Sequence, residues 1–267
     1  MKYPGSKWSI ADWIISYFPQ HHSYIEPFFG SGAVLFNKPR SNIDTLNDLD
    51  GNVVNLFEWI RKDPERLARE IYYTPYARQV YDSAFESVPE DSFGRAVNFY
   101  IRLNMGHGFR TNGEKVGWKN DVQGRERAYA AKDWCNLPEK IMAAAERLRG
   151  VQIENMPAVE LIKRFNHSNV LIYADPPYVL SARHGKQYRY EMDNGAQTEL
   201  LEVLHAHKGP VLISGYDSEL YNDSLHDWYR VETDCYSQIA SKKREVLWMN
   251  FAPAGQMSIK DFLEVRP

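Results

Sequence analysis

The chain has 267 residues, enough for one large domain or for a core with an added subdomain. Its 43% hydrophobic and 25% charged residues are typical of a soluble globular protein, which argues against a disordered or fibrous chain. The formal net charge of -3 does not by itself indicate nucleic-acid binding. Any such binding would depend on local clusters of basic residues.

Cysteine usage and the start of the chain indicate a cellular compartment. Cys135 and Cys235 lie far apart and lack metal-ligand spacing, which favours a reducing compartment over a disulfide framework. The residues after Met1 are polar and include glycine, unlike a signal peptide. No apolar window has the length of a membrane span. We therefore expect a cytoplasmic protein that does not bind membranes.

The first predicted elements surround a glycine-containing turn. The stretch Lys2-Tyr3-Pro4-Gly5-Ser6-Lys7 precedes a helix predicted from Ser9, as its cap, to about Phe18. A short strand then enters Glu26-Pro27-Phe28-Phe29-Gly30-Ser31-Gly32, and a helix follows. Glycines here let the backbone approach a ligand closely. The third glycine of a dinucleotide fingerprint is absent, so the turn suits a nucleoside with a positive or zwitterionic tail better than a pyrophosphate.

An acid follows the second predicted strand. Asp48 lies about 18 residues after Gly30, where a carboxylate can accept hydrogen bonds from ribose hydroxyls. The alternative is that Asp48 and Asp50 cap the helix that begins near Val53. The turn and the acid at this separation together favour a nucleoside site.

The middle of the chain, from Asp63 to about Gly150, changes character. Amphipathic helices are predicted there, including 93–103 and 137–148, with Gly150 ending the second. Residues 105–132 have no clear period and contain many glycines and basic residues, which predicts a long loop or small irregular unit. Aromatic residues alternate with arginines there, as on nucleic-acid-binding surfaces. Disorder with incidental charge is the alternative.

An alternation of strands and helices returns after Gly150. Strands are predicted at 151–155, 169–175 and 211–216, helices at 158–165 and 197–208, and an antiparallel hairpin from 228–233 and 245–251. The strand from 169 ends in Asp175-Pro176-Pro177-Tyr178, which combines an acceptor carboxylate, a carbonyl, rigidity and an aromatic face. Such a set suits a flat nucleobase at the ligand-binding edge of an α/β sheet. A simple proline-containing turn is the alternative.

The order of these motifs resembles that of the Dam-type (D12 class, alpha group) adenine-specific DNA methyltransferases. The resemblance covers most of the chain and is weakest between Asp63 and Gly150. It implies an α/β fold: a Rossmann-like methyltransferase core with a mixed, mostly parallel sheet, plus a mainly helical inserted target-recognition subdomain. The core would comprise residues 1–62 and 150–267, and the DNA-binding subdomain residues 63–149.

The resemblance also implies roles for individual residues. The catalytic tetrapeptide would be Asp175, Pro176, Pro177 and Tyr178. The cofactor, S-adenosylmethionine, would contact Tyr3, Lys7, Glu26, Pro27, Phe28, Gly30, Gly32, Asp48, Asn155 and Asp175. The predicted DNA contacts are Arg102, Asn104, Arg110, Asn112, Lys115, Lys119, Arg125, Arg183 and Lys186, with Arg110 the leading candidate for reading guanine.

The implied reaction is methylation of the N6 amino group of adenine in double-stranded DNA by base flipping, without a metal and with S-adenosylhomocysteine as product. A monomer or weak dimer in a bacterial or phage-infected cell is expected, and the resemblance leaves open whether it belongs to a phage, a restriction-modification system or a host chromosome. Asn155-Met156-Pro157 replaces the acid that many members carry after the third strand, and residues 105–132 do not closely match the GATC-recognising version.

Three other functions stay open at this point. A cytosine-N4 methyltransferase would use the same geometry, although that group more often has serine at the position of Asp175. An RNA or protein amino-methyltransferase could share the tetrapeptide. A catalytically silent DNA-binding module is disfavoured by the presence of Asp48 and Asp175.

Overall fold

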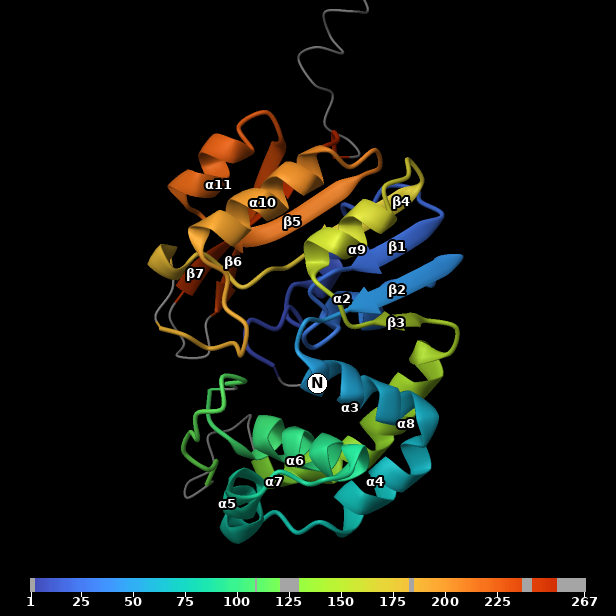
Figure 1. Ribbon diagram of the computed structural model, residues 1–267, viewed down its shortest axis with the longest axis vertical. Helices are drawn as coiled ribbons and strands as arrows, with labels where there is room; N and C mark the ends of the chain where they lie inside the picture. Colours follow the sequence, from blue (N-terminus) through green and yellow to red (C-terminus); the bar gives the residue numbers. More distant parts are fainter. Residues whose placement is uncertain (1–2, 109, 121–129, 183–184, 237–241, 254–267) are drawn as a thin grey trace, which may run out of the picture.

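A mixed sheet forms the centre of the computed structural model, which describes residues 3–253 except 109, 121–129, 183–184 and 237–241. Among these residues, seven strands lie in the order β3-β2-β1-β4-β5-β7-β6 (Figure 1). The strands are β1 Ser23–Glu26, β2 Ile43–Asn47, β3 Gln152–Glu154, β4 Val170–Ala174, β5 Val211–Tyr216, β6 Tyr229–Tyr236 and β7 Lys242–Met249. Neighbours from β3 to β5 pair in parallel, and β7 is antiparallel to both β5 and β6. This confirms the predicted mixed, mostly parallel sheet and its edge hairpin.

The sheet is covered on both faces, which explains why β4 is apolar throughout. Its side chains alternate between two hydrophobic clusters: Leu171 and Tyr173 belong to one, and Val170, Ile172 and Ala174 to the other. Helices α9 Ala158–Arg164, α10 Asn194–His205 and α11 Glu219–Ser224 contribute to the second cluster. Helices α1 Ala11–Ile15, α2 Ala33–Asn37 and α3 Gly51–Lys62 contribute to the first.

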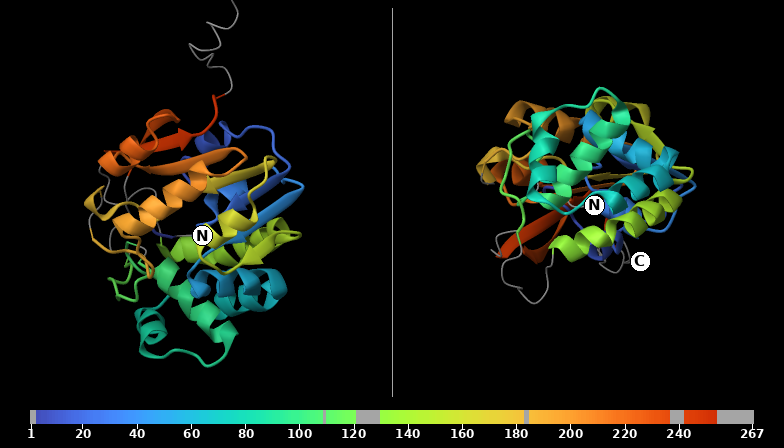
Figure 2. Two further views of the ribbon diagram at one scale, coloured as in Figure 1. Left: turned by 45° about the horizontal axis from the view of Figure 1, so that its top comes forward. Right: turned by 90° about the horizontal axis from the view of Figure 1, so that it is seen from below.

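The middle of the chain is mainly helical, as predicted. It contains α4 Pro64–Tyr73, α5 Arg78–Glu86, α6 Ser92–Met105, α7 Ala130–Cys135 and α8 Leu137–Leu148. Figures 1 and 2 show these helices with α3 as one group beside the β3 edge of the sheet. They share a single hydrophobic cluster with α3 and the sheet. The division of the chain into a core and an inserted subdomain stays a prediction.

One local prediction needs correction. Helix α1 begins at Ala11 without a side-chain cap, so Ser9 is not its cap. The helix ends early because Tyr17 and Phe18 donate to carbonyls three residues back, which tightens the chain into turns. The predicted irregular unit contains one antiparallel bridge, between Gly106 and Trp118, beside which His107 N donates to Gly117 O at 2.8 Å and Lys119 N to Met105 O at 2.8 Å. The other described residues between 106 and 119 are irregular, as predicted. We call the described residues 106–108 and 110–119 the 106–119 hairpin.

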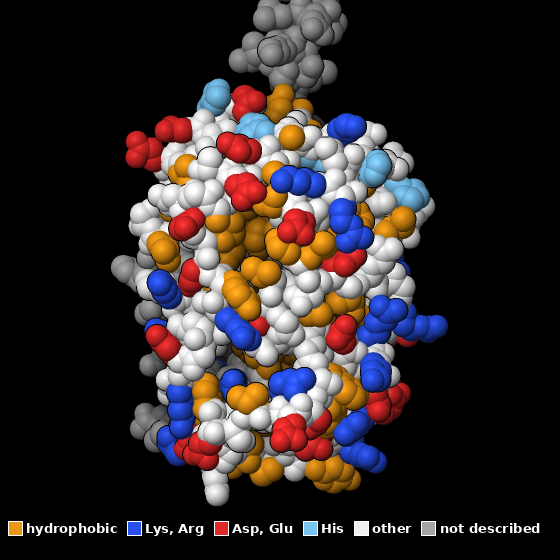
Figure 3. Space-filling view, viewed as in Figure 1, with side chains coloured by type: hydrophobic (Ala, Val, Ile, Leu, Met, Phe, Trp, Pro, Cys, Tyr) orange, Lys and Arg blue, Asp and Glu red, His pale blue; other side chains and the backbone are white. Residues whose placement is uncertain are grey.

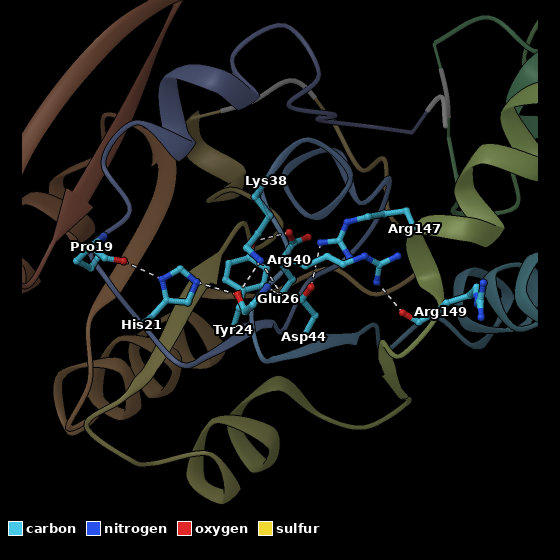
Figure 4. A network of polar contacts seen from close by, with 10 residues as sticks. Pro19, His21, Tyr24, Glu26, Lys38, Arg40, Asp44, Arg147 and Arg149 are labelled. Carbon is cyan, nitrogen blue, oxygen red and sulfur yellow. Dashed lines mark hydrogen bonds and ion pairs between the residues drawn. The ribbon is translucent and has the colours of Figure 1, made fainter.

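A buried ionic network joins the sheet to helix α8 (Figure 4). Asp44 of β2 is 2.8 Å from Lys38 Nζ and 3.0 Å from Arg147 Nη2. Arg40 donates to the backbone carbonyls of Glu146 and Arg149, which satisfies the end of α8. Burial opposes ionisation of Asp44, but the hydrogen bond and attraction of Lys38, with those of Arg147, outweigh it and hold the pKa of Asp44 below its ordinary value.

Replacing Asp44 with alanine is expected to lower the free energy of unfolding by about 3 kcal/mol, because Lys38 and Arg147 would lose their shared counter-charge while buried. Urea denaturation at pH 7 measures the loss. Since the folded pKa is depressed, the wild-type contribution is present at neutral pH and is lost as the pH falls below 3.8. The control Arg149→Ala removes an exposed pair with Glu146 and should cost at most about 1 kcal/mol. Equal losses in both variants would contradict the assignment.

Candidate active site

A cavity of about 490 Å³ opens at the carboxyl ends of the parallel strands. Its walls come from the N-terminal loop, the turn after β1, the acids after β2, the start of α9, the residues after β4 and the segment before α10. Segments far apart in the sequence meet here because parallel strands end at one sheet edge. Such a volume is typical of small-molecule and cofactor sites.

The turn after β1 requires its two glycines. Gly30 and Gly32 have φ of 49° and 67°, a left-handed conformation that other residues rarely adopt. A Cβ on Gly30 would lie 2.9 Å from the Tyr3 ring, and one on Gly32 would lie 2.3 Å from the Phe29 ring. Because these glycines have no side chain, the turn can pack directly against the Tyr3 ring and the Phe29 ring.

The two acids after β2 have different roles in the structure. Asp48 accepts hydrogen bonds from the backbone N–H of Gly30 and of Asp50, each at 2.8 Å, and so joins the two cavity loops. Asp50 accepts from Asn52 N at 3.0 Å and caps α3. The capping alternative therefore applies to Asp50 and not to Asp48. Burial raises the pKa of Asp48 to about 7.

Glu26, at the end of β1, is a buried carboxylate on the cavity wall. The Tyr24 hydroxyl donates to its Oε1 at 2.5 Å, and Lys38 Nζ lies 4.3 Å from the centre of the Tyr24 ring (Figure 4). Burial raises the pKa of Glu26 to about 8, although the Tyr24 hydrogen bond opposes the rise. The group can thus accept or release a proton near neutral pH when a charged ligand approaches.

A buried cation lies between two carboxylates at the catalytic edge. Lys7 Nζ is 2.9 Å from Asp175 Oδ1 and 3.6 Å from Glu245 Oε1, and it donates to Gly5 O at 2.6 Å. Burial alone would lower the pKa of Lys7, but attraction by Asp175 and Glu245 raises it above its ordinary value. Lys7 is therefore a fixed positive charge that holds both carboxylates in place.

The tetrapeptide after β4 is held from several sides. Asp175 Oδ1 accepts from Ser214 Oγ at 3.0 Å, and Pro177 O accepts from Gln197 Nε2 at 2.6 Å. Tyr178 is buried, donates its hydroxyl to Glu245 and meets Tyr216 edge to face, with ring centroids 4.6 Å apart. Among the described contacts of Asp175, all use Oδ1, so Oδ2 is the oxygen turned to other partners.

The structure brings most of the predicted cofactor residues to one cavity: Tyr3, Lys7, Glu26, Pro27, Phe28, Gly30, Asp48 and Asp175, together with Pro177. Gly32, Pro176 and Tyr178 are not among the residues that line it. Asn155 also lies outside it, and its amide donates to Asp48 O at 2.7 Å, so it supports the acidic loop from behind. Sequence reasoning missed two contributors to the site: residues 188–192, which line the cavity, and Glu245, which was expected only within a late strand.

The predicted DNA contacts divide into two groups. Arg102 donates to Ala84 O and lies 4.7 Å from the Phe85 ring, and buried Asn104 donates to Tyr100 O, so both side chains point inward. Arg110, Asn112, Lys115 and Lys119 lie on the 106–119 hairpin, and Lys186 lies opposite Asn112, whose amide donates to its carbonyl at 3.3 Å. Arg125 and Arg183 lie outside the described residues. On this face, Lys and Arg side chains border a hollow (Figure 3).

The placement of metal-ligating side chains and the length and polarity of the helices also bear on the class of protein. In the described ranges, no group of three or more His, Cys, Asp or Glu side chains is arranged to hold a metal ion. Of the helices that the structure describes, each is too short or too polar to cross a membrane.

Comparison with known proteins identifies the family. The D12 class N6 adenine-specific DNA methyltransferase family matches residues 3–239. A DNA adenine methylase of Salmonella typhi is 25% identical over 252 residues, covering 86% of this chain and 84% of the relative. The DNA adenine methylase of Escherichia coli K12 is 25% identical over 245 residues, covering 86% and 83%. A DNA N-6-adenine-methyltransferase of Escherichia phage P1 is 25% identical over 250 residues, covering 86% of this chain but 31% of the relative. With this cavity and the Asp-Pro-Pro-Tyr tetrapeptide at one sheet edge, the chain belongs to the D12 class of N6 adenine-specific DNA methyltransferases.

Proposed function

We propose that the cavity binds S-adenosylmethionine and the target adenine side by side, and that Asp175 and Pro176 bind the adenine amino group. The observation that carries this proposal is the place of Asp175: it lies on the wall of the cavity that also contains Glu26 and Asp48. The family match already selects adenine N6 over cytosine N4. What is proposed here is how individual residues perform the reaction.

The charges of the cavity fit this cofactor. S-Adenosylmethionine, when bound, supplies a methyl group activated by its sulfonium, and it carries a net positive charge. The cavity is lined by three acids whose pKa values are raised by burial: Glu26, Asp48 and Asp50. A cation restores their ionised form. Glu26 would hold the ammonium group and Asp48 the ribose hydroxyls, and Phe28 and Pro157 offer apolar surface for the cofactor's adenine ring.

The acceptor amino group needs activation because its lone pair is delocalised into the purine ring. Asp175 Oδ2 and Pro176 O would each accept one amino hydrogen, which favours a tetrahedral nitrogen and directs its lone pair at the methyl group. Lys7 and Ser214 hold Asp175 through Oδ1, so its second oxygen has a fixed position. Tyr178 would stack on the base while Glu245 holds its hydroxyl.

DNA would lie along the 106–119 hairpin and the facing segment near Lys186. Arg110 and Lys115 are exposed there, and in the described part of the chain their ion pairs are surface ones, with Glu114 and Asp82, which DNA can replace. The substrate is proposed to be duplex DNA, from which the base flips out at a cost of a few kcal/mol. We further propose residues 63–149 as the target-recognition subdomain and a monomer or weak dimer as the active species.

Substituting Asp175 with alanine should reduce methylation of duplex DNA by at least about a hundredfold, since an acceptor used in the transition state is lost. Binding of S-adenosylmethionine, measured by calorimetry, should persist. The matched control Asp223→Ala changes an exposed acid on α11 and should leave both measurements unchanged. Turnover by Asp175→Ala near the wild-type rate would refute the proposed mechanism.

Cofactor affinity should rise with pH up to about 8. Glu26 has a pKa of about 8 without ligand, and an adjacent ammonium group stabilises its ionised form, so binding releases a proton. Calorimetry in buffers of different ionisation enthalpy measures that release. In Glu26→Gln the rise between about pH 7 and 8 should vanish, leaving the rise below about pH 7 that comes from Asp48. An unaltered pH profile in the variant would exclude Glu26 as the ammonium ligand.

Replacing Arg110 with alanine should relax sequence preference at one base pair by about 1–3 kcal/mol. Lys115→Ala provides the contrast, because a phosphate contact weakens binding uniformly and lowers the salt dependence. Sequencing of methylated DNA from cells that express each variant identifies the sites. Uniform weakening in Arg110→Ala would instead make Arg110 a phosphate contact.

A further inference from the structure

The segment between the tetrapeptide and α10 lies against the cofactor cavity. We call residues 185–192 the strap. Its Tyr188, Arg189 and Met192 line the cavity. The Tyr188 hydroxyl packs against Gly5, and its ring centroid is 6.2 Å from that of Tyr3. The strap therefore forms one wall of the site, and the reaction assigned above gives it no role.

The strap is internally braced and attached to the acidic loop. Glu191 Oε1 accepts from the backbone N–H of Gln187 at 2.7 Å and of Tyr188 at 3.0 Å, which closes its turn. Arg189 Nη1 is 3.5 Å from Asp50 Oδ1. The other oxygen, Asp50 Oδ2, is buried and has no hydrogen-bond partner in the described part of the chain. A displacement of the strap would therefore change the surroundings of the cofactor-binding acids.

Thr111 joins the strap to the 106–119 hairpin. Its backbone N–H donates to Gln187 O at 2.9 Å, and its hydroxyl oxygen accepts from Arg189 N at 3.3 Å. The same hydroxyl lies 3.5 Å from Gln187 O, to which it donates. Thr111 thus bonds to the strap at two residues, Gln187 and Arg189.

The residues beside Thr111 are more exposed than Thr111 itself. Thr111 is 8% exposed, whereas Arg110 is exposed and Asn112 is half-buried. Both are proposed to contact DNA. The hairpin therefore carries proposed DNA contacts on either side of Thr111, whose own hydrogen bonds are to the strap. A shift of the hairpin on DNA would be transmitted directly to Gln187 and Arg189.

We propose that Thr111 is a positioning residue that couples DNA binding to cofactor binding through the strap. This inference rests on the proposed role of the hairpin in DNA binding. When DNA orders the hairpin, Thr111 orders Tyr188 and Arg189 over the cofactor, so the second ligand meets a wall that is already in place. By thermodynamic linkage, each ligand strengthens the other by the same factor.

The test measures that factor in the full-length chain. S-Adenosylhomocysteine, which cannot donate a methyl group, is titrated with and without a duplex that contains the unmodified target site. The ratio of its two dissociation constants is the coupling factor. Thr111→Val keeps the side-chain volume and the backbone hydrogen bond but removes the hydroxyl. It should lower the coupling factor at least about fivefold. Thr111→Ser, which retains the hydroxyl, should restore it.

Controls separate this inference from general loss of stability and from the proposed function. Thr74→Val removes a hydroxyl bonded to Glu70 O on α4 and should leave the coupling factor unchanged. A wild-type coupling factor in Thr111→Val would overturn the inference, even if Arg110→Ala and Lys115→Ala weaken DNA binding as expected. Unchanged DNA affinity in those two variants would instead overturn the proposed DNA-binding face, and the coupling role with it.

Discussion

The buried ion cluster of Lys7 with Asp175 and Glu245 is the interaction on which the site depends. It joins three segments that are remote in the sequence: the N-terminal loop, the end of β4 and strand β7. Lys7 lies between the two carboxylates, and its positive charge offsets the repulsion between them. Burial nevertheless raises the pKa of Glu245. The same cluster holds the Tyr178 ring, because Glu245 also accepts the tyrosine hydroxyl.

Sheet topology explains how Glu245 reaches this cluster. The parallel strands β1, β2, β4 and β5 deliver their last residues to one edge. Strand β7 runs in the opposite direction, so its early residue Glu245 pairs with Tyr216 at the end of β5. One reversed strand therefore adds a carboxylate to an edge that otherwise receives only strand ends. Strand β7 therefore both pairs with β5 and supplies the Glu245 carboxylate to the ion cluster.

The local motifs were predictable because each depends on short-range chemistry. Glycine at positions 30 and 32 reflects a left-handed turn, and the prolines after Asp175 stop a buried strand. The place of Asp48 after the second strand was also expected. The different roles of Asp48 and Asp50 were not expected, because both residue types can cap a helix. Only their hydrogen-bond partners in the structure distinguish them.

The sequence by itself therefore determined the class of fold, the family and the residues at the turns, since hydrophobic periodicity and turn chemistry act between near neighbours. Only the tertiary structure decided which side chains share the cavity. Arg102 and Asn104 are residue types that often contact DNA, but helix packing directs their side chains inward. Neither Thr111 nor Glu245 was expected in the site, because their contacts arise from hairpin docking and strand reversal. Such contacts depend on long-range register, which a linear pattern of residue types does not encode.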